Sequence, residues 1–112
     1  MAAFQSGRAD EAEQLILRAI RILPTAASYH ANLGNILQAQ GKLAQAEAAY
    51  RRALERREEQ AEVHLNLGHV LKAQGQVDLA LVSYQRSLAL KPDLAEAAAA
   101  ESMALRKRSC SP

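Results

Sequence analysis

The feature that most constrains this chain is a repetition. Thirteen residues from His30 read HANLGNILQAQGK, and 34 residues later the chain reads HLNLGHVLKAQGQ from His64. When residues 27–60 are laid over residues 61–94 without gaps, 13 of the 34 positions are identical. Self-similarity at a fixed period of roughly 20–50 residues is typical of stacked units, each of which buries its apolar face against its neighbour.

Within each repeat the apolar residues recur at helical spacing. His30, Leu33 and Leu37 mark one helical stripe, and a second stripe runs from Ala46 through Tyr50. Glycine is the usual residue just beyond a helix end, as at position 41 and its equivalent one period later. Each repeat is therefore predicted to be a helix–turn–helix, and the fold class is all-α. The predicted helices lie near residues 8–22, 26–40, 43–57, 60–74, 77–90 and 94–107.

Two glycines, Gly34 and Gly68, fall in the middle of predicted helices. A glycine there costs about 1 kcal/mol relative to alanine. We therefore expect a neighbouring group to pass too close for a β-carbon. Tyr50 and Tyr84 are the large side chains predicted to fill the space opposite.

These positions resemble the tetratricopeptide repeat family, through Leu33-Gly34, Ala46 and Tyr50 and their equivalents in the second repeat, which ends with Pro92. The resemblance implies an α-solenoid. Glu58 replaces the usual proline, so the helix before it is allowed to run long. Glu101-Ser102 replace the Leu-Gly pair, which predicts a polar-faced capping helix. The implied layout within one domain, residues 1–112, is a partial repeat at 1–25, repeats at 27–60 and 61–94, a capping helix at 95–108 and a tail at 109–112.

Composition narrows the function classes. The 112 residues suit one domain, or a piece of a larger protein, with a net charge of only +2. The one basic run, residues 106–108, is interpreted as a solvated helix end, so no nucleic-acid partner is expected. No apolar run approaches the ~20 residues of a membrane span, so no membrane partner is expected. Cys110 is the single cysteine, which excludes an internal disulfide and favours a cytoplasmic location.

No arrangement of side chains indicates catalysis. His64 and His69 are five residues apart and do not share a helical face, unlike a metal-binding pair at i, i+4. His30 and His64 are interpreted as filling the aromatic packing position of the repeat. Cys110 has no basic partner nearby in the sequence. We predict no metal, no cofactor and no enzymatic activity.

The family resemblance implies a binding surface on the first helix of each repeat, along a concave wall. Its amides, Asn32 and Asn66 at one repeat position, resemble the asparagine ladder of O-linked N-acetylglucosamine transferases; the alternative is that they are only solvated or cap neighbouring helices. The family's carboxylate clamp for chaperone tails needs basic residues where this chain has Ala31, Glu96 and Ala100, so that mode is not expected. The predicted peptide-binding residues are Asn32, Asn35, Gln38, Leu65, Asn66, His69 and Lys72.

The predicted function is a protein–protein interaction scaffold that holds an extended or helical segment of a partner protein. Two alternatives stay open. The chain is an accessory segment of a larger enzyme such as a glycosyltransferase, or it is a self-assembly module. A homodimer through the N-terminal half repeat is expected, because its apolar side chains lack the helix that normally covers them. Those side chains are Ala12, Leu15, Ile16, Ala19, Ile20 and Leu23, with Phe4 added to the patch.

Overall fold

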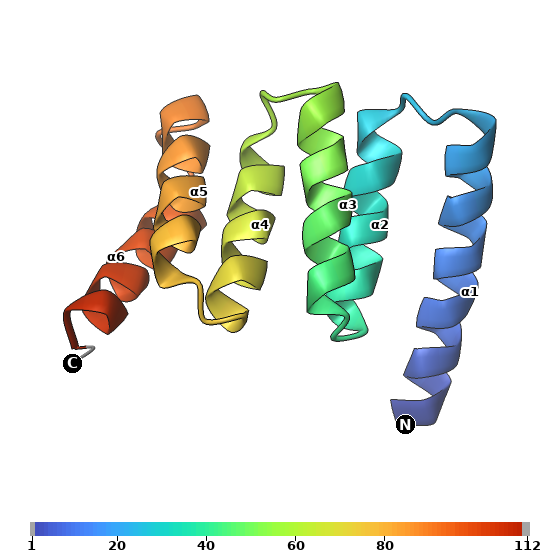
Figure 1. Cartoon of the computed structure of the whole chain (residues 1–112), viewed down its shortest axis with the longest axis horizontal. Coiled ribbons are helices and arrows are strands. Elements are labelled where there is room, and N and C mark those ends of the chain that lie inside the picture. The colour runs from blue at the N-terminus through green and yellow to red at the C-terminus, as the bar shows by residue number, and fades with distance from the viewer. Residues whose placement is uncertain (1, 111–112) are drawn as a thin grey trace. The chain divides into compact units, whose positions relative to one another are not determined.

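The computed structural model describes residues 2–110, and the side chains of residues 7–109. The described residues form six helices and no strand (Figure 1). They divide into two compact units, which meet in sequence between Glu58 and Glu59. The helices of the first unit are α1 (Ala2–Ile22), α2 (Ala27–Ala39) and α3 (Leu43–Arg56). Those of the second are α4 (Ala61–Ala73), α5 (Val77–Leu90) and α6 (Ala95–Cys110).

The predicted helices agree closely with the observed ones. The four central helices begin and end within one residue of prediction, whereas α1 starts at Ala2 instead of residue 8 and α6 continues to Cys110. The helix before Glu58 does not run long. It ends at Arg56, and Arg57 is extended, with φ −153° and ψ 106°. The acidic linker thus breaks the helix without the proline that the family usually has there.

In the first unit α2 packs against both α1 and α3. Ala46, Tyr50 and Ala53 of α3 are fully buried and make its core with Leu33 and Leu37 of α2. A polar contact adds to this packing at the end of α2, where the amide of Gln40 donates to Asp10 Oδ1 at 2.9 Å and to Glu13 Oε1 at 3.1 Å. The partial repeat is therefore joined to the first full repeat by polar as well as apolar contacts.

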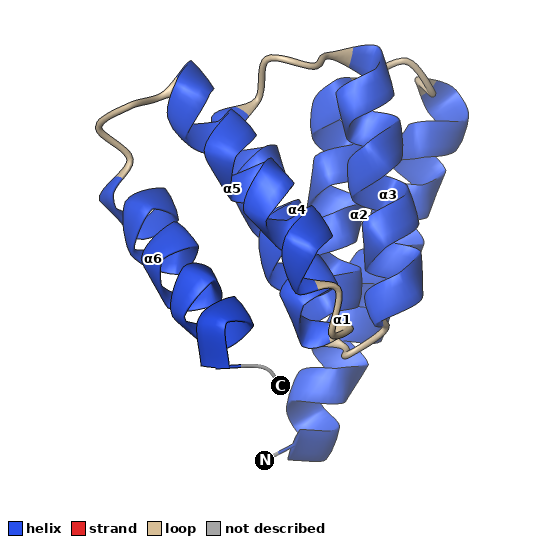
Figure 2. Cartoon of the chain, turned by 60° about the vertical axis from the view of Figure 1, so that its left-hand side comes forward, coloured by secondary structure: helices blue, strands red, loops and turns tan. Residues whose placement is uncertain are grey.

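In the second unit α4 packs against α5 (Figure 2). α6 packs against α5 and also contacts α4. Val70, Tyr84 and Ala104, one from each helix, are fully buried. Ser87 stands where the family has alanine, and its buried hydroxyl donates to the carbonyl oxygen of Ala61 at 2.8 Å. This bond ties the first turn of α4 to the last turn of α5.

α2 and α4 end on glycine turns, whereas the starts of α2, α3, α4 and α5 have no side-chain cap. Gly41 and Gly75 have φ of 78° and 84°, the left-handed conformation that glycine adopts most easily. Lys42 N–H then reaches back to the carbonyl of Leu37, and Gln76 N–H to that of Leu71, both at 2.9 Å. By contrast, none of the residues preceding α2, α3, α4 and α5 caps its helix with a side-chain hydrogen bond.

The two mid-helix glycines are packing residues, as the sequence predicts. Each faces the ring of the tyrosine of its own repeat, Gly34 with Tyr50 and Gly68 with Tyr84. Both rings are fully buried. Gly34 and Gly68 have no β-carbon. The second helix of each repeat can therefore approach its first helix closely.

Candidate functional site

The seven residues predicted to bind a peptide lie on the first helices of the repeats, three on α2 and four on α4. Asn32 and Asn35 are exposed, whereas Gln38, Asn66, His69 and Lys72 are partly buried. Leu65 is only 3% exposed. Its burial counts against a direct contact with a partner, and the six polar residues remain the candidate surface.

In the first unit, the hydroxyl of Tyr50 holds two of these polar side chains. It lies 2.7 Å from Asn35 Oδ1 and 2.7 Å from Gln38 Oε1. A phenol carries one proton, so at any moment it donates to one of these two amide oxygens. The ring of Tyr50 thus fills the core, and its hydroxyl orients amides at the surface of α2.

The second unit uses the same repeat position with different chemistry. His69 replaces Asn35, and its Nδ1 lies 3.0 Å from the hydroxyl of Tyr84. The two rings meet edge to face, with centroids 5.4 Å apart and an interplanar angle of 62°. His69 Nε2 also lies 3.4 Å from Glu96 Oε2, at the start of α6. The imidazole is therefore held between a buried phenol and an exposed carboxylate.

Burial raises the pKa of Tyr50 to about 12 and raises that of Tyr84 in the same direction. The cause is desolvation, since the charged phenolate is disfavoured away from water. Both hydroxyls thus stay protonated near neutral pH and serve as fixed hydrogen-bonding groups beneath the polar residues. They are not placed to act as bases.

An apolar groove adjoins the asparagines of the first unit, and three of its lining residues belong to the apolar patch predicted on the N-terminal half repeat. Ala12, Leu15 and Ile16 of α1 line it together with Asn32, Asn35 and Ile36 of α2, around a volume of about 470 Å³. Leu15, which the N-terminal half repeat was predicted to leave uncovered, is 56% exposed. The side chain of Phe4, predicted to join the patch, lies outside the described side chains.

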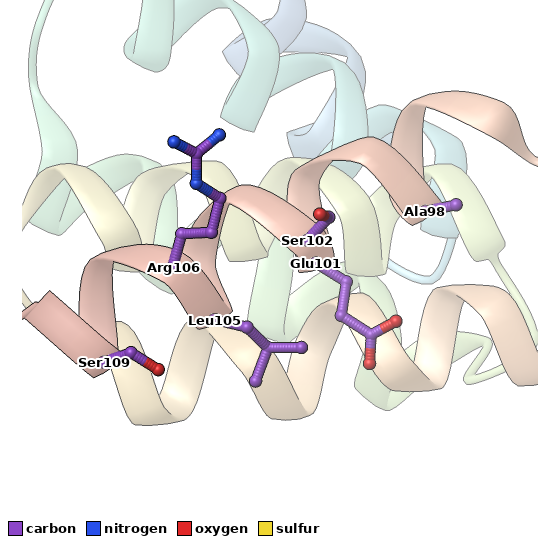
Figure 3. A pocket seen from close by; sticks show the side chains of 6 residues that line it. All are labelled: Ala98, Glu101, Ser102, Leu105, Arg106 and Ser109. Atoms are coloured by element: carbon purple, nitrogen blue, oxygen red, sulfur yellow. The ribbon is translucent and has the colours of Figure 1, made fainter.

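A second groove, of about 460 Å³, runs along α6. All six residues that line it project from this one helix (Figure 3). Its opposite face, with Ala97 and Ala104, is fully buried. The lining residues are Ala98, Glu101, Ser102, Leu105, Arg106 and Ser109.

The buried histidines occupy the aromatic packing position. Both His30 and His64 are buried, and His30 Nε2 donates to the carbonyl of Pro24 at 2.9 Å, across the turn from α1 to α2. Among the described residues, no group of three or more His, Cys, Asp or Glu side chains could hold a metal ion. The burial of both imidazoles fits the packing role predicted for them.

The sequence pattern of the tetratricopeptide repeat matches residues 24–93, well over half of the chain. The chain belongs to the tetratricopeptide repeat family. A comparison with curated protein sequences finds no significant match. Within residues 2–110, no helix of this tetratricopeptide repeat protein is both long and apolar enough to cross a membrane.

Solved structures confirm the all-α solenoid class. The tetratricopeptide domain of Arabidopsis OM64 is 20% identical, with a TM-score of 0.87 over 95% of this chain and 88% of that one. The first such domain of Spaghetti (RPAP3), solved with the HSP90 peptide SRMEEVD, is 21% identical, with a TM-score of 0.89 over 95% and 84%. An O-GlcNAc transferase of Thermobaculum terrenum is 32% identical, with a TM-score of 0.82 over 93% of this chain but only 20% of that one.

Proposed function

We propose that this tetratricopeptide repeat protein binds an extended or helical segment of a partner protein through polar residues of α2 in one unit and of α4 in the other. The contact residues are Asn32, Asn35 and Gln38 in one unit and Asn66, His69 and Lys72 in the other. Asparagine amides both donate and accept, so they can pair with a partner's backbone whatever its sequence. We assign the chain no reaction of its own, and its single cysteine favours a reducing, cytoplasmic compartment.

The observation that carries this proposal is the same in both units. A buried tyrosine hydroxyl orients the polar residue one turn beyond an asparagine, Asn35 after Asn32 and His69 after Asn66. Side chains that are already held lose less conformational entropy when a partner binds. A purely solvated surface would not need a buried phenol beneath each of these residues.

The partner is not expected to be an acidic chain terminus. A terminal carboxylate is bound best by lysine or arginine in charge-assisted pairs. At the corresponding places this chain has Ala31, Glu96 and Ala100, and the exposed Glu96 would repel an anion. The acidic peptide seen with Spaghetti is therefore a useful negative probe for this chain.

The test begins with a phage-displayed library of random peptides, from which binders to this chain are selected. Their affinities are then measured with the double variant Asn32→Ala/Asn66→Ala. Losing two amides that pair with a peptide backbone is expected to weaken binding about tenfold to a hundredfold. Circular dichroism should show unchanged helix content, because alanine is a strong helix former.

A matched control removes two exposed amides from the second helices, Gln45→Ala/Gln85→Ala. This control should bind selected peptides with unchanged affinity. If both double variants bind equally well, or if the acidic peptide SRMEEVD binds as tightly as the selected ones, the proposed surface is wrong.

A second candidate function is that of a segment within a larger glycosyltransferase. The 32% identity to the O-GlcNAc transferase, together with the paired asparagines, favours it. Reading the gene beyond both ends of this sequence tests the idea directly. A catalytic domain in the same reading frame would support it, and stop codons close to both ends would exclude it.

A further inference from the structure

We propose that copies of this chain associate head to tail, with α6 of one copy seated in the groove between α1 and α2 of the next. The groove includes Asn32 and Asn35 of the proposed segment-binding residues, whereas those on α4 lie in the other unit. The proposal stands on the repeat register, on matching side-chain volumes and on matching charges.

The second unit shows what the groove of the first unit would hold. There, α4 packs against both α5 and α6, and Ala80, Tyr84 and Ala104 are fully buried. The equivalent positions of α1 and α2, 68 residues earlier, are Ala12, Ile16 and Ile36. These three residues line the open groove instead. The groove therefore has the lining of a site for a helix of the α4 type, the first helix of a repeat.

By the same register α6 is a first helix of this type. Its groove-lining residues Ala98, Glu101, Ser102, Leu105 and Arg106 correspond to His30, Leu33, Gly34, Leu37 and Gln38 of α2. On α2 this face packs against the second helix of the repeat, α3. On α6 it is the face of the exposed groove in Figure 3. The second unit thus displays a first-helix face, and the first unit has a groove for such a face.

Side-chain volumes match across the proposed contact. In both full repeats a glycine faces a tyrosine ring, and a β-carbon there would collide with the ring. On α6 the glycine position is Ser102, which does carry a β-carbon. On α1 the tyrosine position is Ile16, which carries no ring. A larger residue on one helix is therefore matched by a smaller one on the other.

Charge and apolar contacts match as well. Within the first unit, Leu33 and Leu37 of α2 line one groove with Ala49 and Arg52 of α3. By register, Leu33 and Leu37 of α2 correspond to Glu101 and Leu105 of α6. Ala49 and Arg52 of α3 correspond to Leu15 and Arg18 of α1. The register thus brings Glu101 toward Arg18, and joins Leu105 and Leu15, which are 39% and 56% exposed. The occupant that fits both features is a second copy of the chain.

Charge reversal tests this pairing by sedimentation velocity over the micromolar range. The wild-type chain should form concentration-dependent assemblies, because a head-to-tail contact joins two different faces and continues into a ring or a filament. Arg18→Glu alone and Glu101→Arg alone should each weaken association about tenfold, since each places like charges opposite one another. A mixture of the two single variants should associate again, because the charges are then complementary between unlike chains.

Apolar variants give a second readout that does not depend on charge. Leu15→Gln and Leu105→Gln should each dissociate the assemblies. Val82→Gln, at a similarly exposed position on α5, should leave them intact. All three side chains are exposed, so melting temperatures at low concentration should change little.

Two outcomes overturn the proposal. A monomer at every concentration would show that no second copy occupies the groove. A dimer that Leu15→Gln dissociates but Leu105→Gln and Glu101→Arg leave intact would be a symmetric contact between two α1 helices, the dimer expected from the sequence. Because Asn32 lines this groove, the peptide-binding test is read here from Asn66→Ala alone, in the other unit, and below the concentration at which the chain associates.

Discussion

The ring of Tyr50 lies against the backbone of Gly34 so closely that a β-carbon on the glycine would be 2.5 Å from Cε1 of the ring. The ring is fully buried and has no open space into which to move. We therefore expect Gly34→Ala to destabilise the protein by about 1–3 kcal/mol through overpacking. This cost exceeds the roughly 1 kcal/mol that alanine gains over glycine as a helix former.

Chemical denaturation of Gly34→Ala against wild type measures this cost. Gly7→Ala is the matched control, because Gly7 is also helical and exposed, and a β-carbon added there would meet no atom within 4 Å. The control should gain up to about 1 kcal/mol. Equal stabilisation of both variants would mean that the tyrosine ring does not restrict position 34.

The pairing of His69 with Tyr84 predicts a rescue by the residue that the first repeat uses. His69→Ala removes a hydrogen-bonding partner from a buried phenol and the edge-to-face ring contact, which should cost about 1–3 kcal/mol. His69→Asn should recover part of this loss, since Asn35 bonds Tyr50 from the equivalent position. Thermal melts of both variants decide the point, and an asparagine no better than alanine would show that the phenol has no need of this partner.

The buried hydroxyl of Ser87 predicts a cost for restoring the family's alanine. Ser87→Ala removes the bond to the carbonyl of Ala61 and should destabilise the protein by about 1 kcal/mol. Ser102→Ala, at an exposed position of α6, should change stability by less than about 0.5 kcal/mol. Urea titrations of both variants check this difference. A more stable Ser87→Ala variant would mean that the serine is tolerated in the core rather than useful there.

The raised pKa of Tyr50 makes stability depend on alkaline pH. The unfolded tyrosine ionises near pH 10, whereas the folded one ionises near pH 12, so the unfolded state loses its proton first. The stabilisation is complete below pH 10 and is lost as the pH rises toward 12, by about 2–3 kcal/mol for this one group. Denaturation curves at pH 9 and at about pH 11.5 measure the loss.

Tyr50→Phe is the control for this pH dependence. Phenylalanine does not ionise, so the variant should be less stable at neutral pH, through its lost hydrogen bonds, but should lose less stability between pH 10 and pH 12. The remaining alkaline loss includes that of Tyr84, whose pKa is also raised by burial. If the wild type and Tyr50→Phe lose stability equally, the Tyr50 phenol is more hydrated than its burial indicates.

The helices were predictable because the same packing pattern of residues occurs twice in the sequence, 34 positions apart. Gly34 and Gly68 are each constrained by the tyrosine ring of their own repeat, so the same residue recurs 34 positions later. The early start of α1 was not predictable, because Gly7 corresponds by register to Gly41 and Gly75, which end helices, whereas here Gly7 lies within α1. The role of a residue that contacts only its own repeat could therefore be predicted from this single sequence.

The candidate site was predictable only in part. Register alone located Asn32, Asn66 and His69 on the first helices, but it did not reveal that tyrosine hydroxyls hold their neighbours. That contact depends on how far a ring on α3 or α5 reaches across its repeat. The groove beside Asn32 also depends on the exposure of Leu15, which register suggests and only the packed helices determine. Leu65 shows the opposite case, since a position shared with the family's binding wall is buried here.

Some helices have uncapped starts and closed ends. This difference affects where hydrogen exchange begins in the fold. No side chain caps α2, α3, α4 or α5, so the first amide protons of these helices have no side-chain acceptor. The glycine turns after α2 and α4 keep the opposite ends closed. Deuterium should therefore enter α2 and α4 from their first turns and advance toward their last. The first helix of each full repeat then frays at its start, while the tyrosine-filled centre of the repeat stays protected.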